Sequence, residues 1–99
     1  MTLTAEQIQE NWVEFLGNIT DYVEMPRQQK LLDFYTKYED RIILMPAANN
    51  KKYHSAFPGG YVDHVNRVVK GALAMSDVWE SFGCDMTTFT QEELVFSAI

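Results

Sequence analysis

The sequence predicts an all-α protein, because apolar residues recur at spacings of three and four along most of the chain. Thr4 with Gln7, and Thr90 with Glu93, have the spacing of a helix capping box, in which each side chain bonds to the backbone N–H of the other residue. Only short, turn-rich pieces separate the helix-period segments, and there is neither an internal repeat nor a low-complexity linker. We therefore expect a single helical domain over residues 1–99, with four main helices and no β-sheet.

The first two helices are expected over residues 5–19 and 26–40. The apolar face of the first helix consists of Ile8, Trp12, Phe15, Leu16 and Ile19. Pro26 suits the first turn of the second helix, because its missing N–H is not needed there. One face of this second helix carries Leu31, Leu32, Tyr35 and Tyr38. The pattern breaks near Asp40, and we expect irregular structure over residues 45–58.

The third helix is expected over residues 61–82 and should be the longest. Its helical period is carried by Tyr61, Val65, Val68, Ala72, Met75, Trp79 and Phe82. Gly83 follows at the position where a C-terminal cap belongs. Large side chains at helical spacing usually form the core, so we expect Met75 and Trp79, like Trp12 of the first helix, to be buried.

The last helix is expected over residues 91–99, directly after its cap at Thr90. It runs through "ELVFSAI" without a glycine, a lysine or an arginine that would signal a helix end. We therefore expect the domain to be incomplete at its C-terminus. The residues expected to pack on helices encoded downstream are Leu94, Val95, Phe96 and Ile99. By itself, the chain should be marginally stable or should self-associate.

The composition is that of a small globular protein, with 46% hydrophobic and 13% aromatic residues. A formal net charge of −6 argues against broad attraction to a nucleic-acid backbone or an anionic membrane. The single cysteine, Cys84, excludes an internal disulfide and a Cys-rich zinc site, and it fits a reducing compartment. Because the sequence shows neither a signal peptide nor a transmembrane run, we expect a soluble, cytoplasmic protein.

Both histidines of the chain lie in the stretch "YHSAFPGGYVDHV", on either side of a Pro-Gly-Gly turn. In one interpretation the stretch is only a turn, His64 is an ordinary helical residue and His54 is a loop residue. In the other, the glycines leave room for a ligand near the helix start and an imidazole supplies a metal bond from a rigid helix. Two histidines ten residues apart do not define a metal site, because at least two more ligands are needed.

Residues 54–73, "HSAFPGGYVDHVNRVVKGAL", resemble the opening segment of HD-domain metal-dependent phosphohydrolases. Members of that family read roughly His-His-Ala, two residues, Gly-Gly-Leu-x-Glu-His-Thr, and then a helix. The close match covers about a fifth of the chain. The resemblance implies a helical bundle of the HD-domain type, with N-terminal helices over residues 1–45 and the start of the HD core over residues 46–99. The His-Asp doublet that names the family would follow further along, after a helix that begins much like "TQEELVFSAI".

In the family, the histidine after the Gly-Gly pair is the first metal ligand, and the matching residue is His64. The implied cofactor is a divalent ion (Mn, Mg, Fe, Ni, Co or Zn), whose bound water attacks a phosphorus atom. We expect this chain alone not to retain the ion. The predicted substrate-binding residues are His54, Gly59, Gly60 and Arg67. His54 would contact the substrate phosphate or support the metal ligands from behind, and Gly59 and Gly60 would keep the approach open. Arg67, one turn after His64, would reach the phosphate or belong to the solvated surface. The sequence does not define which residue is catalytic.

The chain departs from the family pattern in three places: Ser55 replaces a second histidine, Asp63 replaces the glutamate before the ligand, and the chain reads Val-Asn-Arg after His64. Three functions therefore stay open. The first is a metal-dependent phosphohydrolase that acts on a nucleotide, a phosphomonoester or a nucleic-acid end. The second is a degenerate HD-like module that binds a nucleotide or a partner without catalysis. The third is an unrelated helical interaction domain in which Pro-Gly-Gly is only a turn.

Overall fold

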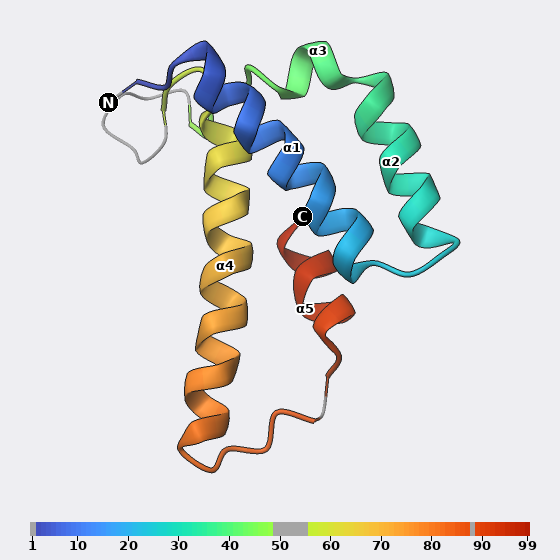
Figure 1. Cartoon of the computed structure of the whole chain (residues 1–99), viewed down its shortest axis with the longest axis vertical. Helices are drawn as coiled ribbons and strands as arrows, with labels where there is room; N and C mark the ends of the chain where they lie inside the picture. Colours follow the sequence, from blue (N-terminus) through green and yellow to red (C-terminus); the bar gives the residue numbers. More distant parts are fainter. Residues whose placement is uncertain (1, 49–55, 88) are drawn as a thin grey trace.

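A computed structural model describes residues 2–48, 56–87 and 89–99, and every regular element in these ranges is an α-helix (Figure 1). The helices are α1 (Ala5–Tyr22), α2 (Arg27–Lys37), α3 (Glu39–Ile42), α4 (Gly60–Ser81) and α5 (Gln91–Ala98). The prediction of an all-α protein is confirmed for this part of the chain. The expected helix over residues 26–40 is instead divided, because Tyr38 leaves helical geometry at φ −108° and ψ 19°.

The four longer helices form a small bundle, and α1 and α4 are its central pair (Figure 1). α1 packs along the first half of α4, and α5 packs against both of these helices. α2 folds back along α1, and α3 follows it as a single turn. The second half of α4 extends away from α1 and α2, so this part of the helix has few neighbours of its own.

Both predicted capping boxes are present. The Gln7 N–H donates to the Thr4 hydroxyl at 3.1 Å, and the Thr4 N–H donates to the Gln7 side-chain oxygen at 2.9 Å. At α5 the same two bonds join Thr90 and Glu93, each at 3.1 Å. Since a capping box satisfies N–H groups that the helix itself cannot pair, the sequence alone located both helix starts.

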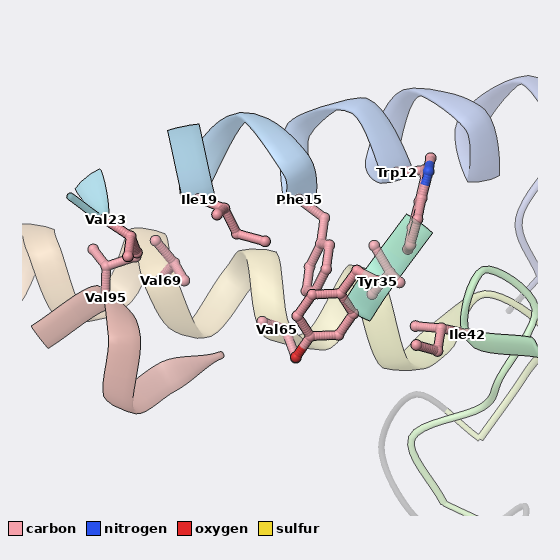
Figure 2. Packing of buried hydrophobic residues seen from close by; sticks show 10 residues of the cluster. Trp12, Phe15, Ile19, Val23, Tyr35, Ile42, Val65, Val69 and Val95 are labelled. Atoms are coloured by element: carbon pink, nitrogen blue, oxygen red, sulfur yellow. The ribbon is translucent and has the colours of Figure 1, made fainter. Parts of the chain in front are cut away.

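The core lies where α1 faces α4, α2 and α5 (Figure 2). It contains Trp12, Phe15, Ile19, Val23, Tyr35, Ile42, Val62, Val65, Val69 and Val95. Phe15 is at its centre with no exposed surface. Its ring is perpendicular to that of Tyr35, with ring centres 4.8 Å apart, and it stacks on Trp12 with ring centres 5.5 Å apart. Burial, and then the hydroxyl of Tyr61 beside it, raise the pKa of Tyr35, so the phenol stays neutral in the folded protein.

Polar side chains set the register of α1 on α4. Asn66 of α4 is buried; its amide donates to the backbone oxygen of Asn11 at 2.9 Å and accepts from Asn18 at 3.4 Å. At the edge of the same interface, Lys70 pairs with Glu14 at 2.8 Å. Because buried amides must keep their hydrogen bonds, these contacts allow one rotation of α4 relative to α1.

The apolar face of α5 is used largely within the chain. Val95 is buried and points toward Val23 and Val69 (Figure 2), while Leu94 and Ile99 are half-buried. Phe96 remains exposed, with the Arg27 guanidinium 4.7 Å from its ring centre. Val95 was expected to pack on helices encoded downstream, but it is buried within this chain, because α5 packs against both α1 and α4.

None of the helices described here combines the length and the apolar character that crossing a bilayer requires.

Candidate functional site

The candidate site is the start of α4, where the chain returns from α3. Three backbone N–H groups at this point donate to nearby carbonyl oxygens: Gly59 to Leu44 at 3.1 Å, Gly60 to Phe57 at 2.9 Å and Tyr61 to Met45 at 2.9 Å. The bonds to Leu44 and Met45 tie the helix start to the segment after α3, and the bond to Phe57 closes a turn just before α4. Gly59 has φ +81°, a left-handed conformation that favours glycine.

Gly59 and Gly60 are buried, and a methyl group on Gly59 would lie 2.9 Å from Cγ1 of Ile8 on α1. The chain therefore needs glycine at position 59 for its own packing, whether or not a phosphate binds. Sequence reasoning expected open space beside this pair, and at Gly59 the space is taken by Ile8. A phosphate contact by the two glycines stays a prediction.

Gly59→Ala should lower the free energy of unfolding by about 2–3 kcal/mol, because left-handed geometry costs a non-glycine residue about 1–2 kcal/mol and the contact with Ile8 adds strain. The matched control is Gly83→Ala, which has φ +85° but no atom within 4 Å of the added methyl. Urea denaturation of both variants measures the difference. An equal loss in the two variants would show that the Ile8 contact does not matter.

His64 and Arg67 lie on α4 within its first two turns, and both are exposed. Nε of Arg67 donates to Oδ2 of Asp63 at 3.0 Å, and the buried carboxylate of Asp63 accepts a second bond at Oδ1 from Nδ2 of Asn11 at 3.2 Å. Sequence reasoning did not include Asn11. Its signal was available, since Asn11 and Asn18 lie seven residues apart, as core positions of a helix do.

His54, which was predicted to contact substrate, falls outside the described residues. Within the described ranges, no group of three or more His, Cys, Asp or Glu side chains is arranged to hold a metal ion. These residues therefore do not by themselves fit a metal centre. His64 is one candidate ligand, and the others would have to come from outside the described ranges.

α4 carries a second apolar face, which points away from α1. Its large apolar side chains are Val68, Met75, Val78 and Phe82, and the same stripe includes His64 at its start and Gly71 between them, at alternating spacings of four and three residues. We call this stripe the outer face of α4. Met75 is 55% exposed and Phe82 is 74% exposed, and the neighbouring Trp79 is 48% exposed. The prediction that Met75 and Trp79 are core residues is therefore wrong in this structure, although Trp12 is buried as predicted.

Comparisons with protein-family models, with curated proteins and with solved structures found no match.

Proposed function

We propose that this chain forms part of an HD-domain type metal-dependent phosphohydrolase, which acts on a nucleotide, a phosphomonoester or a nucleic-acid end. The observation that carries the proposal is the spacing of His54, Gly59, Gly60 and His64 at the start of a long helix. In the proposal His64 binds the divalent ion, while His54 and Arg67 contact the substrate phosphate. A cytoplasmic location is part of the proposal, since an exposed lone thiol such as Cys84 suits a reducing compartment.

The outer face of α4 supports this proposal and suggests where the other ligands come from. A helix that is apolar on two sides is normally covered on both, and alternating spacings of four and three are those of a seam between packed helices. His64 is the first residue of this seam. We propose that the covering element is the helix that carries the His-Asp doublet, because a helix packed there would bring its side chains next to His64.

The direct test is metal-dependent hydrolysis by the full-length protein. The protein is freed of metal with a chelator and is then assayed with p-nitrophenyl phosphate, a 5′-nucleotide and a 3′-phosphorylated oligonucleotide. We expect hydrolysis of at least one substrate to return when Mn²⁺ or another divalent ion is added. If no ion restores hydrolysis of any substrate, the enzyme assignment is wrong and a non-catalytic binding module replaces it.

Met75→Lys should weaken metal retention by the full-length protein at least about tenfold, because a lysine would place a charge in the seam between α4 and the covering helix. Asp77→Lys is the matched control, since Asp77 is exposed on α4 but outside the outer face. Metal content after dialysis checks both variants. Equal retention by Met75→Lys and the unaltered protein would show that no ligand-bearing helix packs there.

A further inference from the structure

We infer that Asp63 and Asn11 are positioning residues, which hold the guanidinium of Arg67 in the orientation that a phosphate requires. The inference rests on the proposed function, because it takes a phosphate as the ligand of Arg67. It adds two residues that are not in the set of predicted contacts, and one of them, Asn11, lies on a different helix.

The Asp63 carboxylate accepts hydrogen bonds from Asn11 of α1 and from the exposed guanidinium of Arg67. Its side chain is 12% exposed, whereas that of Arg67 is 56% exposed. One carboxylate oxygen accepts from Arg67 Nε at 3.0 Å, and the other accepts from Asn11 Nδ2 at 3.2 Å. The backbone oxygen of Asn11 is held in turn by the buried amide of Asn66, so Asn11 is itself fixed at the interface of α1 and α4.

The hydrogen bond from Asn11 of α1 distinguishes the Asp63–Arg67 pair from an ordinary surface ion pair. An aspartate and an arginine four residues apart on a helix commonly pair, but an exposed pair fixes little, because both side chains change rotamer freely. Here the carboxylate of Asp63 cannot rotate without losing the bond from Asn11. The carboxylate that accepts from Arg67 is therefore held by contacts from two helices rather than from one.

The choice of Nε as the donor decides what Arg67 can bind. A guanidinium has five N–H donors, and the bond to Asp63 uses the one on Nε. Four donors are left on Nη1 and Nη2, and one N–H from each of these nitrogens can bind two phosphate oxygens in parallel. Because Asp63 offsets the charge of Arg67, the pair would recognise phosphate through hydrogen-bond direction more than through net charge.

A double-mutant cycle in the full-length protein, freed of metal with a chelator, tests the inference, with inorganic phosphate and pyrophosphate as probes. Dissociation constants are measured from the shifts of backbone amide signals in α4 by nuclear magnetic resonance. Asn11→Ala should weaken phosphate binding about threefold to tenfold, whereas in the Arg67→Ala background the same change should have no further effect. The Nε–H of Arg67 should also be rigid in the unaltered chain and mobile in Asn11→Ala. Asn18→Ala is the control, because it removes a contact of the same interface without touching Asp63.

Two results would overturn the inference. If Asn11→Ala weakens binding equally with and without Arg67, then Asn11 is only structural. If Arg67→Ala binds both probes as well as the unaltered chain does, then Arg67 does not contact phosphate. Both results come from phosphate binding and not from the hydrolysis assay, so the two failures are distinguishable. Either binding result overturns this inference, and absent metal-dependent hydrolysis overturns the proposed function.

Discussion

Phe15→Ala should lower the free energy of unfolding by about 3–5 kcal/mol, because it removes a fully buried ring and leaves a cavity between Trp12 and Tyr35. A domain of this size is typically stable by only about 5–10 kcal/mol, so the variant would lose much of its stability. Urea denaturation followed by circular dichroism at 222 nm measures the loss.

Val13→Ala is the control for this experiment, since Val13 lies on the same helix but is exposed. Its effect should stay within about 0.5 kcal/mol. A loss below about 1 kcal/mol for Phe15→Ala would mean that the site collapses around the missing ring and that the core is not centred on Phe15.

Under the proposed function, His64→Ala should reduce metal-dependent hydrolysis by the full-length protein at least about a hundredfold, because loss of a metal ligand lowers metal affinity strongly. Helix content should hardly change, since His64 is exposed and is not a core residue. His54→Ala should slow turnover without releasing the metal. Initial rates, metal content and circular dichroism together check these outcomes.

Ser81→Ala, at the far end of α4, is the matched control for His64→Ala and should keep full activity. If His64→Ala also retains full activity and its full metal content, His64 is an ordinary helical residue. The spacing of the two histidines would then carry no functional meaning.

Local signals predicted most of the secondary structure. The boxes at Thr4 and Thr90 start α1 and α5, and Gly83, with φ +85°, follows the end of α4. The division after Lys37 was missed, because Leu31, Leu32, Tyr35 and Tyr38 keep the helical period up to the break. Periodicity indicates which residues share a face, but it does not show that the backbone changes direction.

The larger error concerned which face of α4 is buried: Met75 and Trp79 were expected in the core and are exposed. Both Val65 and Val69 on one side and Met75 and Phe82 on the other satisfy the helical period. Periodicity alone does not rank two apolar faces of one helix. In the structure the first side faces α1, and this rotation also pairs Asp63 and Asn66 with Asn11.

Sequence reasoning identified the site residues that lie close together in the chain, but not the contacts that residues far apart in the chain make with them. His64 and Arg67 belong to one stretch of helix, and a motif can identify them. Asn11 lies 52 residues before Asp63, and its contact exists only once α1 packs on α4. The packing of Ile8 against Gly59 likewise exists only once α1 packs on the start of α4. It occupies the space beside Gly59 that the sequence was expected to leave open for a ligand.

The central claim, that His64 binds the catalytic metal ion, is tested most directly by pulsed electron paramagnetic resonance of the full-length protein loaded with Mn²⁺. The account predicts a nitrogen coupling from a coordinated imidazole, which changes on ¹⁵N-histidine labelling and is lost or reduced in His64→Ala. A nitrogen coupling that is absent from the unaltered protein, or that is unchanged in His64→Ala, would contradict the account.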